Sequence, residues 1–339
     1  MRSSRLRRLL AAAGCALGSL LAQPALANGY SDLVFFGDSL SDTGNLFLAT
    51  GGAQLASPYF NGRASNGPLW TEVMAGLLGQ PGDAQPYLVG GNNYAFAGAR
   101  TGTDDTPPGV LAQAVGVWGA SHASADPNAL YVVVGGGNDM RDARRDFADM
   151  GSAADAASRQ AAAVTAVTQL GQTVGYLASK GARNVLIANL PDLGFTPEAA
   201  LLGKQAASSD ASARFNALLP GLVATGNGMG LNMSFVDFAG IGSLVRLDAQ
   251  FNGGGVFGIT NVTTPCGPFA GSVGIDCDVS AFSDALHPTA KVHQIFGLYA
   301  AQAALRHAPS MPVPEPGTYA MMLVGLLGLA GARRRMRRG

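Results

Sequence analysis

Four short apolar runs are spread along the chain, and each is followed by turn-forming residues. They are Leu33 to Phe36, Tyr131 to Val134, Val185 to Ala188 and Met233 to Val236. A continuous apolar run of this length is typical of a strand that is buried on both faces. The runs therefore predict four strands of a sheet that is covered on both sides.

Stretches with apolar residues at helical spacing lie between and after these runs. The clearest is Ala153 to Ser179, a second lies near Ala211 to Leu222, and a third continues to about Leu305. The third is expected to begin at Pro288, because proline is favoured at the first helical position. Strands that alternate with helices predict an α/β fold with a mostly parallel sheet, whose sites form at the carboxyl ends of the strands.

The N-terminal end differs from the middle of the chain. Four arginines within the first eight residues precede an apolar stretch from Leu9 to Ala22, and Ala25-Leu26-Ala27 follows. A basic region, a short apolar core and a small-x-small site predict a secretory signal peptide over residues 1–27. The alternative interpretation is a buried N-terminal helix.

The C-terminal end, residues 309–339, has three parts. A proline-rich linker contains Val313-Pro314-Glu315-Pro316, an apolar run covers the 14 residues from Tyr319 to Ala332, and five arginines follow. Spanning a bilayer takes roughly 20 residues, so the run alone is a marginal anchor. The tail resembles the PEP-CTERM sorting signal of Gram-negative bacteria. That resemblance implies export, a transient or permanent membrane tether, and recognition by a membrane sorting protease (exosortase). A plain membrane tail is the alternative.

Removing both ends changes the charge of what remains. The ends hold nine of the 22 basic and one of the 22 acidic residues, so the middle carries 13 basic and 21 acidic residues, a net charge of about −8. An acidic domain argues against nucleic acid as a partner, because phosphate binding requires a basic face. Residues 28–308 are therefore expected to form one acidic domain, secreted or held at the cell envelope or in the extracellular matrix.

Cys266 and Cys277 are the only cysteines outside the predicted signal peptide. In an exported chain, two cysteines 11 residues apart indicate a disulfide. Two free, buried thiols are the alternative.

Ser39 is the first candidate for chemistry. It stands in Gly37-Asp38-Ser39-Leu40, just past the first apolar run, where a side chain is exposed at the rim of the sheet. The alternative interpretation of this segment is a well-capped strand-to-helix turn. A serine nucleophile needs a base, and histidine is the usual one.

His287 is the best candidate base. It precedes a proline, and Asp284 lies three residues earlier, within reach of the imidazole, as the orienting acid of a Ser-His-Asp triad requires. Of the other histidines, His122 stands in a polar loop of small residues. His293 and His307 lie on the predicted C-terminal helix and fit surface or core-edge positions.

Two further segments offer donors for an oxyanion hole. Gly98 lies in a turn of small residues, and Asn138 follows the glycine run after the second predicted strand. The run could instead be a bare turn or a phosphate loop, but no lysine follows it and its spacing fits no nucleotide fingerprint. No serine has glycine at both −2 and +2, so the nucleophile elbow of the α/β-hydrolases is missing.

Together these residues resemble the GDSL (SGNH) family of lipases, esterases and acylhydrolases. The four blocks of that family occur in order: Gly37 to Leu40, the Gly98 segment, Gly136 to Asp139, and Asp284 to His287. The resemblance implies that Ser39 is the nucleophile, His287 the base and Asp284 its orienter. It also implies that Ser39, Gly98 and Asn138 form the oxyanion hole.

The same resemblance implies the SGNH hydrolase fold, a flavodoxin-like three-layer α/β/α sandwich, and no metal or cofactor. The expected substrate is a carboxylic ester, whether a lipid, a short-chain acyl ester or an acylated glycan. Three alternatives stay open from the sequence: an acyltransferase, a thioesterase, and a binding protein that keeps the fold without catalysis.

Overall fold

The computed structural model of this 339-residue chain describes residues 29–104, 106–144, 150–267 and 274–308. The described residues from Tyr30 to Ala308 belong to one unit. The predicted signal peptide (1–27) and the predicted sorting tail (309–339) lie outside the described residues.

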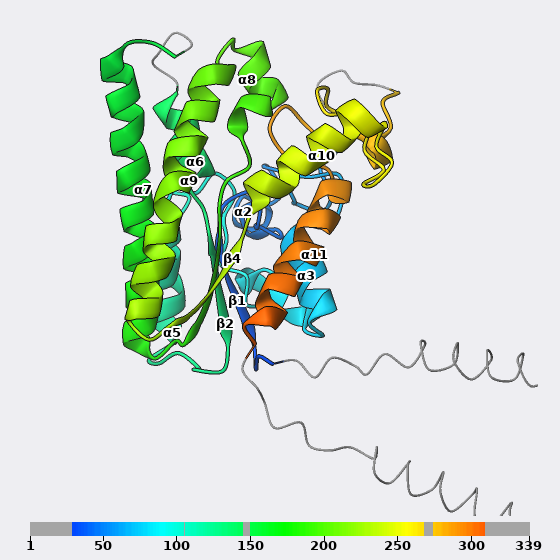
Figure 1. The fold of residues 1–339 in the computed structure, drawn as a ribbon. Coiled ribbons are helices and arrows are strands. Elements are labelled where there is room, and N and C mark those ends of the chain that lie inside the picture. The colour runs from blue at the N-terminus through cyan, green and yellow to red at the C-terminus, as the bar shows by residue number, and fades with distance from the viewer. Residues whose placement is uncertain (1–28, 105, 145–149, 268–273, 309–339) are drawn as a thin grey trace, which may run out of the picture. The chain divides into compact units, whose positions relative to one another are not determined.

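A parallel sheet is the middle layer of this unit (Figure 1). Its four strands pair in the order in which they occur along the chain: β1 (Leu33–Gly37), β2 (Leu130–Val134), β3 (Asn184–Ala188) and β4 (Asn232–Val236). All four coincide with the predicted runs to within one residue at each end.

Residues 92–96 run beside the outer edge of β1. The N–H of Tyr94 donates to the carbonyl of Phe35 (2.7 Å), and the N–H of Phe96 donates to the carbonyl of Gly37 (3.1 Å). With this segment counted as a strand, the order becomes 2-1-3-4-5, as in flavodoxin-like sheets. The segment continues to Gly98 past the same end of the sheet that carries Ser39.

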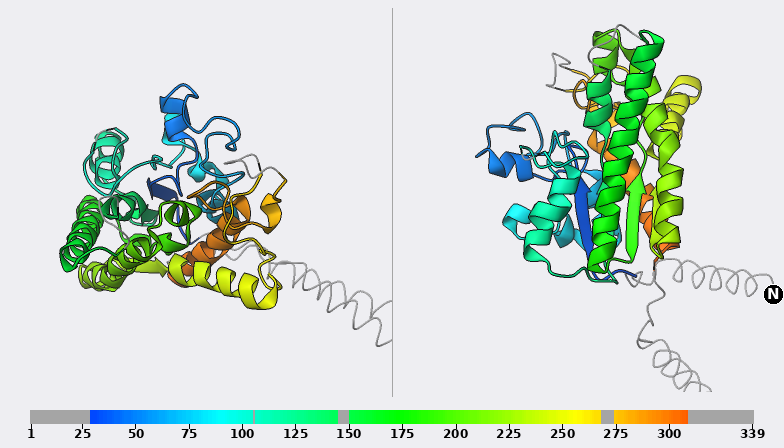
Figure 2. Two further views of the ribbon diagram at one scale, coloured as in Figure 1. Left: turned by 90° about the horizontal axis from the view of Figure 1, so that it is seen from above. Right: turned by 90° about the vertical axis from the view of Figure 1, so that its left-hand side faces the viewer.

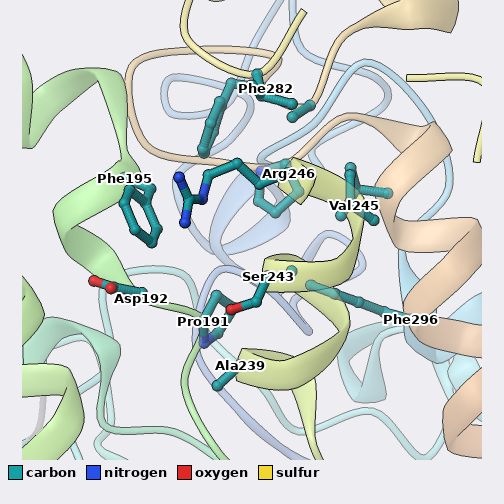
Figure 3. A pocket seen from close by; sticks show the side chains of 14 residues that line it. Pro191, Asp192, Phe195, Ala239, Ser243, Val245, Arg246, Phe282 and Phe296 are labelled. Atoms are coloured by element: carbon teal, nitrogen blue, oxygen red, sulfur yellow. The ribbon is translucent and has the colours of Figure 1, made fainter. Parts of the chain in front are cut away.

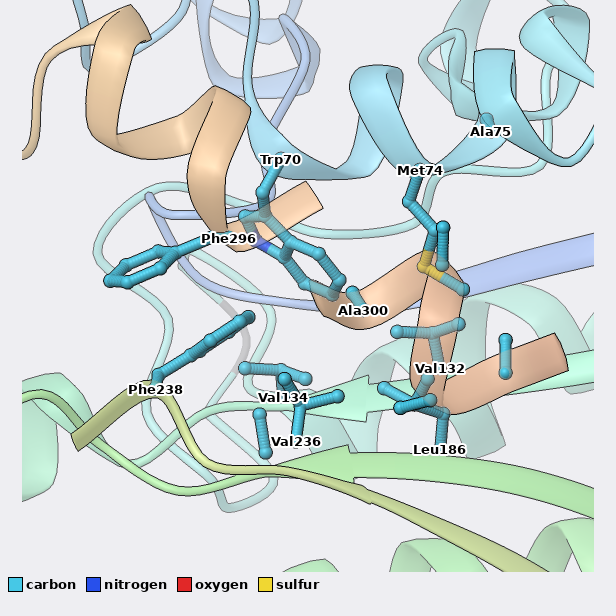
Figure 4. Packing of buried hydrophobic residues seen from close by; sticks show 14 of the residues in the cluster. Trp70, Met74, Ala75, Val132, Val134, Leu186, Val236, Phe238, Phe296 and Ala300 are labelled. Carbon is cyan, nitrogen blue, oxygen red and sulfur yellow. The ribbon is translucent and has the colours of Figure 1, made fainter. Parts of the chain in front are cut away.

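Helices cover both faces of the sheet, so this unit has three layers (Figures 1 and 2). Because side chains alternate along a strand, Phe35 faces one side and Phe36 the other. The Phe35 side packs against α3, α10 and α11, with Trp70 and Phe238 in ring contact 5.2 Å apart (Figure 4). The Phe36 side packs against α7 and α9. Burial of one such large side chain contributes about 1.5–3 kcal/mol.

The α-helices in the described part of the chain are α2 (Asn45–Ala49), α3 (Trp70–Leu77), α4 (Val110–Ala112), α5 (Gly119–Ser121), α6 (Gly137–Ala143), α7 (Ala153–Lys180), α8 (Pro197–Leu201), α9 (Gln205–Gly228), α10 (Phe238–Asn252) and α11 (Ala290–Arg306). Single turns of 3₁₀-helix cover Pro81–Ala84, Tyr87–Val89, Leu193–Phe195 and Cys277–Val279, and Gln113–Trp118 is a π-helix.

Two details of the sequence-based prediction were wrong. β4 is not buried on both faces, since the side chain of Phe235 is 36% exposed. Among the described strands β4 pairs only with β3, so it lies at the edge of the sheet. The last helix does not begin at Pro288. Thr289 is its N-cap and accepts a hydrogen bond from the N–H of Val292, so the helix begins at Ala290, two residues later.

Helix α10 was not predicted at all. It contains two glycines in its first five residues, Gly240 and Gly242, which lower helix propensity and obscure the apolar spacing. Tertiary contacts decide its formation, since Phe238, Ile241 and Val245 are buried against the sheet. This helix forms one wall of a cavity next to the candidate site.

Candidate active site

The turn that carries Ser39 follows β1 directly. A side chain at Gly37 would put a Cβ 2.6 Å from the carbonyl oxygen of Val134, so β1 can approach β2 here only with glycine. The side-chain amide of Gln113 accepts from the N–H of Gly37 (2.9 Å) and donates to its carbonyl (2.8 Å). Both backbone groups of the residue two before Ser39 are therefore held in place.

The carboxyl groups on either side of Ser39 are buried. Asp42 accepts hydrogen bonds from the N–H groups of Gly44, Asn45 and Leu46, at 2.8, 2.6 and 3.1 Å. Burial raises the pKa of Asp38 to about 6, against the opposing effect of its hydrogen bond with the N–H of Leu40. The turn is thus strongly hydrogen-bonded, as its capped-turn interpretation also predicted, while its serine stays at the pocket wall.

Ser39, His287 and Asp284 form a chain of hydrogen bonds. Ser39 Oγ lies 2.9 Å from His287 Nε2, and His287 Nδ1 lies 2.7 Å from Asp284 Oδ2. With Nδ1 protonated, the imidazole donates to the carboxylate, and Nε2 is left to accept from the serine hydroxyl. The structure therefore brings Ser39 together with His287, which lies 248 positions later in the chain, and with its neighbour Asp284.

The carboxylate of Asp284 is held from several directions. Its Oδ1 accepts from the N–H groups of Leu286 (2.7 Å) and His287 (2.6 Å). Burial raises the pKa of Asp284, but the hydrogen bonds and the nearby charge of His287 outweigh it and hold that pKa well below its ordinary range. Asp284 is consequently an anion whenever the imidazole is neutral.

Tyr59 was missed by the sequence-based reasoning. Its hydroxyl donates to Asp284 Oδ2 at 2.7 Å, the same oxygen that accepts from the imidazole. Burial raises the pKa of Tyr59, and the carboxylate of Asp284 raises it further, so the phenol stays protonated. No local sequence pattern predicts this hydrogen bond, because it joins residues that are 225 positions apart.

Asn138 lies at the start of α6, close to the end of β2. The preceding turn needs glycine at position 136, where φ is +113° and a Cβ would lie 2.5 Å from the ring of Phe215. Asn138 Nδ2 donates one hydrogen bond to the carbonyl of Ala99 (2.9 Å). The amide nitrogen carries two protons, so a second remains for a ligand.

Gly98 lies in a turn beyond the segment that pairs with β1. Its φ of +84° is in the left-handed region that favours glycine. Within the described part of the chain, the backbone N–H groups of Ser39 and Gly98 have no acceptor. Ser39, Asn138 and His287 line one cavity, whereas Gly98 is not among its lining residues.

An ion-pair cluster supports the loop that carries Asp284 and His287. The carboxylate of Glu198 accepts hydrogen bonds from Arg141 and from the buried Arg144. The backbone N–H of Glu198 donates to the carbonyl of Ala285 at 2.7 Å. Because Arg141 lies in α6 and Arg144 is the C-cap of that helix, this cluster connects the helix of Asn138 to the loop of His287.

Among the described histidines, only His287 is hydrogen-bonded to Ser39. His122 stacks on Trp118 with ring centroids 4.7 Å apart, and His307 is the C-cap of α11. His293 is fully buried. This burial, and secondarily the charge of His287, lowers the pKa of His293 to about 3.

Cys266 and Cys277 are joined by a disulfide.

Two known family models match parts of this chain. Residues 33–300 match the profile of the GDSL-like lipase/acylhydrolase family. The chain belongs to this family. Residues 312–338, outside the described residues, match the PEP-CTERM protein-sorting motif, which indicates an exported GDSL protein. None of the helices in the described part of the chain is long and apolar enough to cross a membrane.

Several curated proteins resemble this GDSL chain. Esterase EstA of Pseudomonas aeruginosa is 31% identical over 242 residues, which are 61% of this chain and 36% of EstA. Lipase 1 of Photorhabdus luminescens is 33% identical over 202 residues, 58% of this chain and 28% of the lipase. The phosphatidylcholine-sterol acyltransferase of Aeromonas hydrophila is 29% identical over 204 residues, 56% of this chain and 53% of the acyltransferase. The chain thus matches about a third of the length of the first two relatives.

Among solved structures, the carbohydrate acetylesterase Est24 of Sinorhizobium meliloti matches with a TM-score of 0.45 and 17% identity. The match covers 81% of this chain and 98% of Est24.

Proposed function

We propose that this GDSL protein is an exported serine esterase or lipase that hydrolyses carboxylic esters through an acyl-enzyme. The observation that carries the proposal is the hydrogen-bonded chain from Ser39 Oγ through His287 to Asp284, with separations of 2.9 and 2.7 Å. This is the arrangement that turns a weak hydroxyl nucleophile into a reactive one.

The proposed reaction has two steps. Ser39 Oγ attacks the ester carbonyl while His287 Nε2 takes its proton, and the imidazolium then protonates the departing alcohol. A water molecule, deprotonated by the same imidazole, attacks the acyl-enzyme, and the proton returns to Ser39 as the acid leaves. Asp284 stays ionised throughout, orients the ring and stabilises its charged form.

Both tetrahedral intermediates place a negative charge on the former carbonyl oxygen. We assign the N–H groups of Ser39 and Gly98 and the free proton of Asn138 Nδ2 to this oxygen. Backbone donors that already lack an acceptor need no reorganisation when the charge develops, which is the condition for strong electrostatic stabilisation.

The place of action follows from the ends of the chain. The proposal assigns residues 1–27 to a signal peptide, 28–308 to the hydrolase domain and 309–339 to a linker and sorting tail. The enzyme would then work outside the cytoplasm, secreted or tethered at the envelope, after processing by the export machinery and a sorting protease. Its substrates would be lipids, short acyl esters or acylated glycans.

A fluorophosphonate probe tests the proposal directly, because it labels only an activated serine. The full-length protein should be labelled at neutral pH, and the Ser39→Ala variant should not. The Ser41→Ala variant, which alters a serine two residues away in the same turn, is the matched control and should be labelled. Resistance of the folded wild-type protein would refute the serine hydrolase and favour the non-catalytic binding protein.

Acyl transfer is the second candidate, suggested by the similarity to a protein named as an acyltransferase. A transferase and a hydrolase differ only in whether an alcohol or water reaches the acyl-enzyme. Product analysis with and without an added alcohol acceptor separates them. An ester product that exceeds the free acid would replace the hydrolase proposal with the transferase.

A further inference from the structure

A second cavity (Figure 3) adjoins the one that Ser39 lines. The two cavities share the residues Pro191, Asp192, Phe282 and Pro288 in their walls. Pro288 directly follows His287 in the chain. The second cavity therefore begins within one residue of the proposed base.

Apolar side chains form most of its wall. Ala239 and Val245 come from α10, and Phe296 comes from α11 (Figure 3). The one carboxylate among the lining residues is that of Asp192, whose Oδ1 accepts hydrogen bonds from the N–H of Gly194 (2.8 Å) and the hydroxyl of Ser209 (2.7 Å). A polar ligand such as a sugar would lose hydrogen bonds to water here and find few replacements.

Arg246 stands on one side of the cavity. Its guanidinium lies over the ring of Phe195, 3.9 Å from the centroid, and Figure 3 shows it extending from α10 toward that ring. Arg246 and Phe195 also line another cavity, together with Ala249 and Thr263. The Arg246 side chain thus separates the apolar cavity from a more exposed neighbour.

We propose that the apolar cavity binds the acyl chain of the substrate ester, which makes this protein selective for acyl groups longer than butyryl. The inference rests on the proposed function, because the chain must enter from a carbonyl carbon placed at Ser39. An acetyl group would end within the Ser39 pocket, whereas a longer saturated chain would continue past Pro191 and Phe282 into the apolar cavity. Arg246 and Phe195 limit its length.

The expected selectivity follows from the transfer of methylene groups out of water. Each buried methylene favours the longer ester about fourfold, so the four that separate butyrate from octanoate are worth on the order of 200-fold at most. We expect kcat/KM of the full-length protein for p-nitrophenyl octanoate to exceed that for the butyrate by tenfold or more on this basis. All esters are assayed as monomers in solution.

Filling the cavity should remove this preference. Gly242 lines it from α10, and a Cβ built there meets no atom within 4 Å, so Gly242→Phe can enter without a backbone clash. The octanoate-to-butyrate ratio of kcat/KM should fall about tenfold, as expected when about two methylenes lose their place. Gly221→Phe on α9, an exposed helical glycine with equally open surroundings and outside both cavities, is the matched control and should keep the wild-type ratio.

Opening the outer side should act in the opposite direction. Arg246→Ala should raise the decanoate-to-octanoate ratio, because the chain can then extend toward Ala249 and Thr263. If Gly242→Phe does not fold, as judged by circular dichroism, Ala239→Phe on the same face of α10 takes its place.

The outcomes separate the two levels of the proposal. Hydrolysis of acetate, butyrate and octanoate at equal rates, or an unchanged ratio in the folded Gly242→Phe variant, overturns the acyl-chain site and leaves the esterase standing. Failure to hydrolyse any of the esters, together with resistance to the fluorophosphonate, overturns both.

Discussion

Replacing Tyr59 with phenylalanine removes one hydrogen bond to Asp284, the acid of the proposed triad. The hydroxyl and the imidazole Nδ1 lie at the same distance, 2.7 Å, from Asp284 Oδ2. Phenylalanine keeps the ring and removes only the donor. The variant therefore distinguishes two roles of Tyr59. Either its ring only packs against its neighbours, or its hydroxyl positions and partly neutralises the carboxylate that orients His287.

The size of the effect follows from the number of bonds to that carboxylate. Asp284 accepts from Leu286 N, His287 N and His287 Nδ1 in addition to Tyr59, so three of these four bonds remain. A hydrogen bond to a charged group contributes about 1.5–3 kcal/mol. We expect kcat/KM at neutral pH to fall about tenfold, equivalent to about 1.4 kcal/mol. This is far less than the roughly 10⁴-fold loss when the orienting carboxylate of a triad is replaced.

The pH dependence distinguishes positioning from packing. Without the phenol, the carboxylate of Asp284 is less neutralised and attracts the imidazolium form of His287 more strongly. Since that form cannot accept the serine proton, the acid limb of the kcat/KM profile should move to higher pH, by about half a pH unit.

The assay is the kcat/KM profile of p-nitrophenyl butyrate hydrolysis between mildly acidic and mildly alkaline pH. Tyr299→Phe, a change of the same kind on the exposed side of α11, is the control and should leave the profile unaltered. A Tyr59→Phe profile that superimposes on the wild type, or that is lowered equally at every pH, would refute the positioning role.

Three further changes test other parts of the structure. Asn138→Ala should lower kcat by on the order of 100 to 1000-fold with little change in Tm, and an unchanged kcat would remove Asn138 from the oxyanion hole. His293 is buried and has a pKa of about 3, against an ordinary value of 6.5, so between these pH values it takes up a proton only when the chain unfolds. The free energy of unfolding should therefore fall as the pH drops from about 6.5 toward 3, by up to about 5 kcal/mol. Urea titrations of wild type and His293→Gln measure this, and equal slopes against pH would contradict it. The Cys266→Ser, Cys277→Ser double variant should lose about 2.8 kcal/mol, because the disulfide closes a loop of 11 residues; a loss below about 0.5 kcal/mol in urea would contradict that estimate.

The sequence by itself located the four strands and suggested the candidate residues of the site. An apolar run such as Tyr131 to Val134 is bounded by turn residues, so local pattern alone places the strand to within one residue. Asp284 and His287 could be paired for the same reason, since a separation of three residues in a turn brings their side chains together. The charge balance and the two unusual ends were likewise readable without coordinates.

Contacts between distant residues could not be read in this way. Tyr59 meets Asp284 across 225 positions, and Gln113 holds Gly37 across 76, yet neither residue stands in a pattern that marks its partner. Helix α10 was not predicted because its glycines lower the helix propensity of the segment. The helix is stabilised instead by the burial of its apolar side chains against the sheet.

Only the tertiary structure decided the shape of the site. The apolar cavity is bounded by α10, α11 and the segment around Phe282, which are separate in the chain and meet only after the sheet is covered. The chemical type of each side chain is given directly by the sequence and can be recognised locally. A cavity is the space left when distant elements pack, so its walls are defined by the fold as a whole.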